Sequence, residues 1–125
     1  MFSSLLLSLG LFGSQPVALP VHEAFRSSTM QGRGYTLVRF DMPEHDYYLY
    51  QDRFTVTNIS GQPYRVQFMS QAEMHKDEFI GETFIFRDQA FLKVFTHEPF
   101  SVSFQGCKEA TLCYPPTKID VNGAG

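Results

Sequence analysis

The chemistry that this sequence could perform centres on its two cysteines. Cys107 and Cys113 are the only cysteines among 125 residues, and five residues separate them. A loop of that length can return the chain so that the two α-carbons come within the ~4.4–6.8 Å that a disulfide requires. The bond would stabilise the fold weakly, because closing so short a loop removes less entropy than the ~3 kcal/mol estimated for a 15-residue loop. Two interpretations are open: a local staple in a hairpin, or an exchangeable disulfide within reach of another protein's thiolate.

Other candidate groups form no familiar catalytic or metal-binding pattern. Lys108 is the only cation between the cysteines, so we expect thiols that are not strongly activated. Asp77 and Glu78 are adjacent, so on a strand they would point to opposite faces and on a loop they would be solvated. Neither a phosphate-binding glycine loop nor a Ser/His/Asp set is discernible, and we predict no cofactor and no metal. The histidines have irregular spacing and are predicted to be structural or superficial: His22, His45, His75 and His97.

Composition indicates one folded domain. The length suits a single hydrophobic core, and hydrophobic residues make up 43% of the chain against 18% charged residues. A net charge of −3 argues against a nucleic-acid partner. With 13 phenylalanines and 6 tyrosines, the aromatic side chains can supply a core that needs no disulfide to hold it together.

The elements that must position the cysteines are predicted to be strands. Phe100, Val102 and Phe104 alternate with polar residues, as in a strand with one face on a core and one in water. Residues 70–79 are predicted to be an exposed loop, with or without one helical turn, since their apolar residues follow no helical spacing. Short strands bounded by turn residues suggest an all-β sandwich or barrel, and the predicted strands are 35–40, 47–50, 53–59, 64–69, 83–86, 90–96, 100–105 and 117–121.

The N-terminus contains an apolar run of the length of a signal-peptide core. Leu5 to Phe12 form this run, but no Lys or Arg precedes it and no clear cleavage site follows it. Residues 1–12 are therefore interpreted as a signal-like segment or remnant, with a plain hydrophobic arm as the alternative. We assign residues 13–121 to the domain and residues 122–125 to the start of a linker.

Four stretches of sequence together resemble a known family. They are "GLFGSQPVALPVHEAF" near the start, "YYLYQDRF", "DEFIGETFIFRD" and, about twenty residues later, "VSFQGCKEATLCYPPTK". This combination closely resembles the N-terminal periplasmic domain of the bacterial thiol:disulfide interchange protein DsbD, over roughly residues 10–121. A lone pair of cysteines at this spacing would not carry the resemblance.

The resemblance implies an immunoglobulin-like β-sandwich with the cysteine pair on a loop or hairpin at one end. It implies a protein-disulfide reductase module in the periplasm, either standing alone or as a domain of an inner-membrane protein. Such a domain accepts electrons from a thioredoxin-like donor, the C-terminal domain of DsbD. It passes them to periplasmic acceptors such as disulfide isomerases and the thioredoxin-like protein of cytochrome c maturation. The alternative is a binding or structural β-sandwich with a permanent disulfide.

The resemblance also implies roles for individual residues. Cys113 would form the mixed disulfide with partners, and Cys107 would resolve it. Phe79 would sit on a cap loop over the disulfide, with an ordinary core aromatic as the alternative. The remaining residues of the cap loop and site lining would be Asp77, Glu78, Gly81, Tyr48 and Tyr50, although the two tyrosines could simply belong to a core strand.

Overall fold

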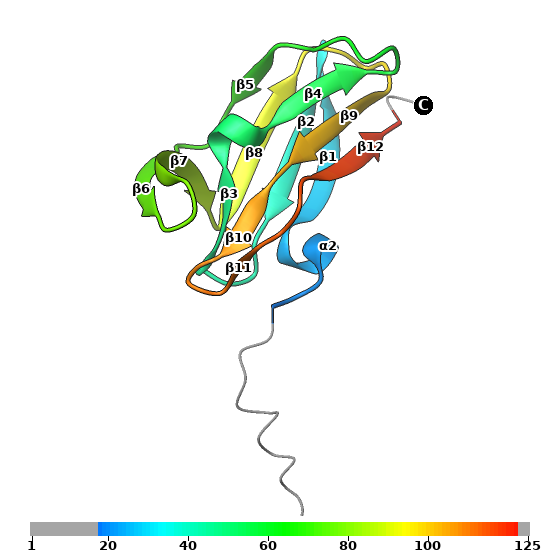
Figure 1. Ribbon diagram of the computed structural model, residues 1–125. Coiled ribbons are helices and arrows are strands. Elements are labelled where there is room, and N and C mark those ends of the chain that lie inside the picture. The colour runs from blue at the N-terminus through cyan, green and yellow to red at the C-terminus, as the bar shows by residue number, and fades with distance from the viewer. Residues whose placement is uncertain (1–17, 123–125) are drawn as a thin grey trace, which may run out of the picture.

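The protein is described by a computed structural model that covers residues 18–122 (Figure 1). The segment 1–12 that resembles a signal, and residues 123–125 of the linker, lie outside this range. The elements are, in chain order, α2 (Val21–Ala24), β1 (Arg26–Gly32), β2 (Tyr35–Asp41), β3 (Tyr47–Tyr50), the 3-10 helix η2 (Gln51–Arg53), β4 (Thr55–Asn58), β5 (Val66–Phe68), β6 (Glu73–Asp77), β7 (Gly81–Arg87), β8 (Gln89–Val94), β9 (Phe100–Phe104), β10 (Gly106–Lys108), β11 (Leu112–Cys113) and β12 (Thr117–Val121).

The strands form the two layers of a β-sandwich. One layer is a four-stranded antiparallel sheet in the order β1-β2-β8-β5. The other contains a three-stranded sheet, β12-β9-β4, and a five-stranded sheet, β11-β10-β3-β7-β6. These two sheets follow one another along the same strand pairs, because β9 continues into β10 while β3 leads through η2 into β4 (Figure 1).

Gln105 lies at the point where the chain passes from β9 to β10. Its carbonyl oxygen accepts a hydrogen bond of 3.1 Å from the backbone N–H of Tyr50, the last residue of β3. Beyond this corner, the five-stranded sheet carries the cysteines at one end of the molecule (Figure 1). The corner therefore joins the three-stranded sheet to the five-stranded sheet that carries the candidate site.

Phenylalanine rings fill the space between the layers. Phe40 from one layer lies 4.8 Å, centroid to centroid, from Phe104 of the other, and Phe54 lies 5.6 Å from Phe40. Phe25, just after α2, packs edge-on against Tyr47 and Tyr114. Aromatic pairs of this kind add to the stabilisation from burial alone. The core predicted from composition is thus confirmed.

Most predicted strands are present, and two regions differ from the prediction. Strands 47–50 and 117–121 have the predicted bounds. The prediction of a loop over 70–79 is wrong, because Glu73–Asp77 pairs along its whole length with β7. Its single apolar residue, Met74, is exposed, so no apolar face marks it as a strand in the sequence. The exposed strand Arg26–Gly32 was missed because it buries neither face.

The predicted strand 53–59 begins instead as the 3-10 turn Gln51–Arg53, and the strand itself is Thr55–Asn58. Among residues 18–122, no helix has the length and apolar character needed to cross a membrane.

Candidate redox site at the cysteine hairpin

The two cysteines face each other across a short hairpin and form a disulfide. Cys107 in β10 and Cys113 in β11 are direct cross-strand partners, with an S–S distance of 2.04 Å and α-carbons 3.9 Å apart. That α-carbon separation is below the ~4.4–6.8 Å usual for disulfides. Gly106 has to be a glycine here, since a Cβ would lie 2.4 Å from the Phe25 ring and 2.6 Å from the carbonyl oxygen of Tyr48.

The two cysteines differ in their access to solvent. Cys107 is fully buried, in a small cluster with Tyr48, Tyr50 and Ile85. Cys113 packs against this cluster from outside and remains partly exposed. Attack on a disulfide requires a path to one sulfur, and Cys113 is the more accessible of the two residues.

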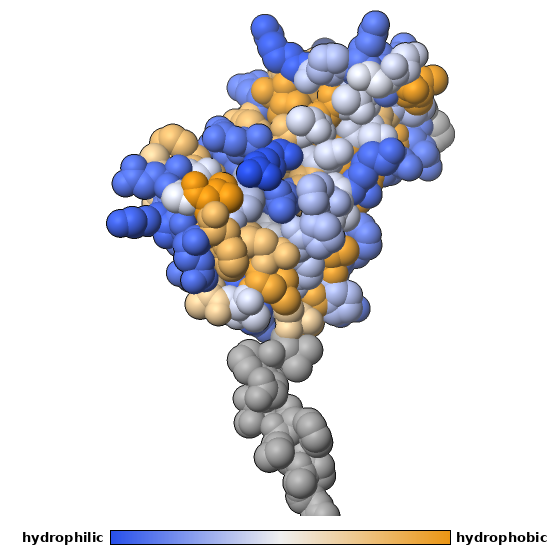
Figure 2. Space-filling model, viewed as in Figure 1, coloured by the Kyte–Doolittle hydropathy of each residue, from blue (hydrophilic) through white to orange (hydrophobic). Residues whose placement is uncertain are grey.

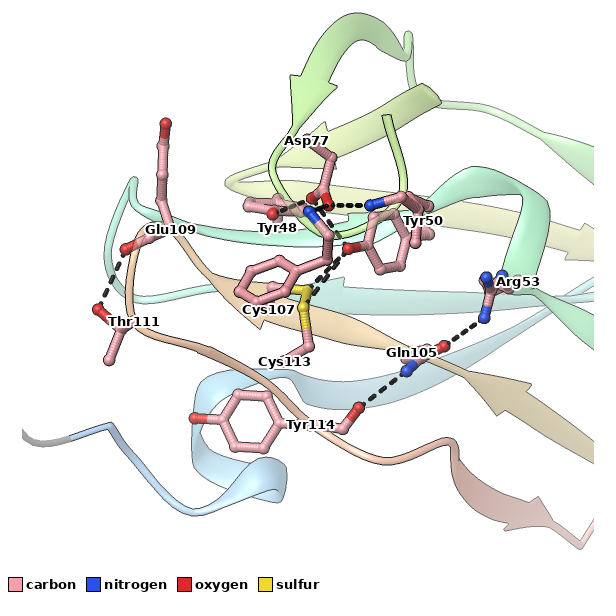
Figure 3. The surroundings of a disulfide bond; sticks show 12 residues. Tyr48, Tyr50, Arg53, Asp77, Gln105, Cys107, Glu109, Thr111, Cys113 and Tyr114 are labelled. Carbon is pink, nitrogen blue, oxygen red and sulfur yellow. Dashed lines mark hydrogen bonds between the residues drawn. A yellow bond between two sulfur atoms is a disulfide. The ribbon is translucent and has the colours of Figure 1, made fainter. Parts of the chain in front are cut away.

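Strand β3 presents two tyrosines to the cysteines because successive side chains of a strand point to opposite faces. Tyr47 and Leu49 belong to the main core, whereas Tyr48 and Tyr50 belong to the cysteine cluster. In Figure 3 both hydroxyl groups converge on Asp77 above the disulfide. The structure therefore brings Tyr48 and Tyr50 to the cysteines, and both are also buried strand residues.

Asp77 is the centre of the hydrogen bonding at this site. Its Oδ2 accepts from the hydroxyls of Tyr48 and Tyr50, the latter at 2.9 Å, and its Oδ1 accepts from the N–H groups of Phe79 and Ile80 at 2.7 and 3.0 Å. Burial alone would raise the pKa of Asp77, but these four donors lower it below its usual value. The carboxylate is only 3% exposed and is nevertheless charged and fully bonded.

The same environment keeps the tyrosines protonated. Burial, together with the hydrogen bond to Asp77, raises the pKa of Tyr50 to about 12 and raises that of Tyr48 further. The Tyr50 oxygen also lies 3.0 Å from Cys107 Sγ and 3.4 Å from Cys113 Sγ. A disulfide sulfur carries no proton, whereas a thiol can donate one to this oxygen. Tyr50 can therefore bond differently to the disulfide and dithiol states.

The segment between β6 and β7 lies beside the site and is tied to it through Asp77. Phe79 is 50% exposed and Ile80 43% exposed, so neither is an ordinary core residue. Glu78 is exposed, and Gly81 has a φ of +85°, a conformation that favours glycine at the end of this turn. Figure 2 shows apolar surface running from this hairpin toward the cysteine hairpin. The lid role of Phe79 remains a prediction.

Lys108 does not act as a free cation beside the sulfurs. Its Nζ lies 3.0 Å from Asp46 and 3.4 Å from Glu44, and 4.7 Å from the centroid of the Tyr47 ring. The hydrogen bond to Asp46 raises the pKa of Lys108, although burial opposes the shift. Its charge is compensated by these carboxylates, in line with the expectation of weakly activated thiols.

Several residues lie at the site although the sequence analysis assigns them no role there. Arg87 lies 5.3 Å over the Tyr48 ring and pairs with Glu109, between the cysteines, at 3.0 Å. His75 stacks on Tyr48 at 4.9 Å between centroids, and its Nε2 is 4.0 Å from Asp77. A strand prediction for 73–77 would have placed His75 and Asp77 on one face, because they are two residues apart.

Comparison with known proteins identifies the family. The family model for the thiol:disulfide interchange protein DsbD, N-terminal, matches residues 15–123. DsbD of Pectobacterium atrosepticum is 35% identical over 113 residues, covering 85% of this chain and 19% of that protein. The chain spans about a fifth of the length of such curated relatives.

Two solved structures from Neisseria meningitidis are similar over most of the chain. The reduced DsbD N-terminal domain superposes with a TM-score of 0.71 and 28% identity, covering 86% of this chain and 91% of that one. A complex of the DsbD and PilB N-terminal domains gives 0.65 and 28%, covering 82% and 84%. The expected immunoglobulin-like β-sandwich is confirmed. With its cysteine pair joined as a disulfide at one end of that sandwich, the chain belongs to the family of DsbD N-terminal domains.

Proposed function

We propose that this domain performs thiol:disulfide interchange in the periplasm through Cys107 and Cys113. It accepts electrons from a thioredoxin-like donor, such as the C-terminal domain of DsbD, and acts as the protein-disulfide reductase module that reduces periplasmic partners. The observation that carries the proposal is the pairing of a partly exposed Cys113 with a buried Cys107 in a chain of this family.

Reduction of the domain proceeds in two exchanges. A thiolate of the donor attacks Cys113 Sγ, the bond to Cys107 breaks, and Cys107 leaves as a thiolate that takes up a proton. The donor's second thiolate then attacks the donor sulfur that is bonded to Cys113. Cys113 leaves as a thiolate and takes up the second proton. Two electrons and two protons reach the domain, and the donor is left with a disulfide.

Onward transfer reverses these roles. The Cys113 thiolate attacks an acceptor disulfide and forms a mixed disulfide, and one acceptor sulfur leaves. Cys107, buried behind Cys113, then attacks Cys113 Sγ and releases the acceptor as a dithiol. The access difference between the two cysteines supports this order, since only one of them can meet a partner first.

The surroundings of the site support protein partners. Apolar surface borders the cysteine hairpin (Figure 2), and Phe79 and Ile80 contribute large exposed side chains there. The related Neisseria domain forms a complex with the PilB N-terminal domain. Disulfide isomerases and the thioredoxin-like protein of cytochrome c maturation are the acceptor classes that we propose. Phe79 is proposed as the cap over the disulfide, and Glu78 and Gly81 as part of the same loop.

Trapping of the mixed disulfide tests the proposal. Cys107→Ser, activated at Cys113 as a mixed disulfide with thionitrobenzoate, is mixed with a reduced thioredoxin-like domain of a DsbD relative whose second cysteine is replaced by serine. The partner thiolate displaces thionitrobenzoate, no thiol remains to release the adduct, and adducts are separated by non-reducing electrophoresis. We expect an adduct through Cys113 and none from Cys113→Ser, whose remaining thiol is buried. An absent adduct, or one formed equally by both variants, contradicts the proposal.

A redox titration separates transfer from a permanent staple. The disulfide is equilibrated with graded ratios of a reduced and an oxidised thiol, and the dithiol fraction is measured by alkylation. A potential above roughly −300 mV supports exchange, and a markedly lower one supports the structural alternative.

A further inference from the structure

Gln105 connects three elements around the disulfide, two residues before Cys107. Its backbone oxygen accepts from the Tyr50 N–H, as described above. Its side-chain Oε1 accepts from Arg53 Nη1 at 2.6 Å, and its Nε2 donates to the carbonyl oxygen of Tyr114 at 3.0 Å. Figure 3 shows this chain of contacts running beside the S–S bond.

Tyr114 directly follows Cys113, so its backbone determines where the Cys113 sulfur lies. The N–H of Tyr114 donates to the carbonyl oxygen of Gly106 at 2.9 Å, while Gln105 takes the Tyr114 carbonyl. The backbone N–H and the carbonyl oxygen of Tyr114 are thus bound by Gly106 and Gln105, which are consecutive in the chain. On the other side of Cys113, residues 109–111 form an exposed turn. Cys113 is consequently held from its C-terminal side.

Arg53 determines which way the Gln105 amide points. A carboxamide can present either its oxygen or its nitrogen, but a guanidinium has only donors and therefore binds the oxygen. With Oε1 on Arg53, the amide nitrogen faces the Tyr114 carbonyl. Arg53 itself lies over the Tyr50 ring, with 5.8 Å between its guanidinium carbon and the centroid. The guanidinium of Arg53 therefore contacts both the Gln105 amide and the Tyr50 ring.

We propose that Gln105, oriented by Arg53, is a positioning residue that keeps Cys113 opposite Cys107 once the S–S bond is broken. The inference rests on the proposed function, because it concerns the dithiol state. In the disulfide state the covalent bond fixes the two sulfurs. In the dithiol state only non-covalent contacts do so, and the effective concentration of one thiol at the other determines how readily the pair closes.

The consequence is measurable without a protein partner. In the equilibrium of the disulfide plus two glutathione thiols with the dithiol plus glutathione disulfide, loss of positioning favours the dithiol. We expect Gln105→Ala and Gln105→Glu each to raise this equilibrium constant about 2- to 10-fold, the factor of one ordinary hydrogen bond. Glutamate retains an oxygen for Arg53 but loses the donor to the Tyr114 carbonyl. Because alanine is neutral and glutamate is negatively charged, similar shifts in both variants would exclude an effect of the added charge.

The matched control is Arg39→Ala. Like Arg53, Arg39 bonds to a side-chain oxygen, here of Asp41 at 2.8 Å, and stacks on an aromatic ring, here Phe91 at 5.3 Å, but it belongs to the other layer. Its removal is expected to leave the equilibrium constant within twofold. Arg53→Ala is expected to raise the constant in the wild-type background and to raise it less in Gln105→Ala, because Arg53 acts through the amide.

The measurement uses the full 125-residue chain, with near-ultraviolet circular dichroism of each oxidised variant to confirm folding. If a Gln105 variant fails to fold, Arg53→Ala against Arg39→Ala carries the test. Unchanged constants in the Gln105 variants, or equal shifts in Arg39→Ala, overturn the positioning role while leaving the proposed function intact. A wild-type disulfide that never equilibrates with glutathione overturns both.

Discussion

Strand β3 (Tyr47–Tyr50) separates two buried regions that differ in chemistry. Tyr47 and Leu49 face the main core, which is built from aromatic and aliphatic side chains. Tyr48 and Tyr50 face the cysteine cluster, a much smaller region whose buried groups include two hydroxyls and the carboxylate of Asp77. One strand therefore serves two interiors through simple alternation of its side chains.

The difference lies in how each region tolerates change. In the main core, burial of apolar area is additive and non-directional, so a lost ring costs stability and little else. In the cysteine cluster the buried polar groups are hydrogen-bond partners of one another. Removal of one group therefore leaves its partners buried without a hydrogen bond. We expect changes in the first region to affect mainly the stability of the fold, and changes in the second to affect also the balance between the disulfide and the dithiol. The following substitutions test that division, ordered by their expected effect on stability.

Phe40→Ala should have the largest effect on stability. Phe40 is fully buried in the layer that lacks the cysteines, and we expect the free energy of unfolding to fall by about 3–5 kcal/mol. The glutathione equilibrium constant of the disulfide should stay within twofold. Denaturant unfolding and redox titration measure the two quantities. Phe95→Ala, at a ring 50% exposed, is the control. A large redox shift in Phe40→Ala would remove the distinction between the regions.

Asp77→Asn should have the next largest effect, about 2–3 kcal/mol, because the tyrosine hydroxyls lose their charged acceptor. The pKa of Asp77 is lowered in the folded state, so its contribution is complete above the ordinary carboxyl pKa of 3.8 and is lost as the pH falls below that value. Urea unfolding at pH 7 and pH 3.5 should therefore show a smaller difference in the variant than in wild type. Exposed Asp52→Asn is the control, and an identical pH dependence in all three proteins would disprove the assignment.

Tyr50→Phe should cost about 1 kcal/mol of stability and should make the disulfide harder to reduce. The dithiol loses an acceptor for its thiol proton, whereas the disulfide loses nothing equivalent, so the equilibrium constant for reduction should fall. Tyr48→Phe is the comparison, since its hydroxyl bonds to Asp77 while the sulfurs lie by that of Tyr50. Equal changes of the reduction equilibrium constant in both variants would mean that the hydroxyls act only by bonding to Asp77 and that the contact of Tyr50 with the sulfurs contributes nothing.

Phe79→Ala should change stability least, within about 0.5 kcal/mol, as expected at an exposed position. If Phe79 covers the disulfide, small thiols should reduce the variant faster than wild type, which stopped-flow measurement with dithiothreitol would detect. Phe84→Ala on the same hairpin is a close control, because that ring is 45% exposed against 50% for Phe79. An unchanged rate would remove Phe79 from the lid role.

Sequence reasoning succeeded where the alternation of apolar and polar residues was strong. Phe100, Val102 and Phe104 are buried on one face of β9 as predicted. It failed for β6 (Glu73–Asp77), whose inward residues are His75 and Asp77, because these two side chains pack against Tyr48 and Tyr50 of a strand far away in the chain. Adjacent carboxylates are expected to point to opposite faces on a strand and to be solvated on a loop; Asp77 ends β6 and is buried, whereas Glu78 follows it and is exposed.

Strand periodicity predicted an all-β fold, and the resemblance of four stretches of sequence indicated the DsbD N-terminal family, with Cys107 and Cys113 as its chemical centre. These properties are local or compositional, so they can be read without coordinates. Only the tertiary structure decided which cysteine is buried, that Asp77 binds both tyrosines, and that Gln105 joins Arg53 to the backbone of Tyr114. The hydrogen bonds of Asp77 to the tyrosines and of the Gln105 side chain join residues between 9 and 52 positions apart, which only the folded chain brings within hydrogen-bonding distance.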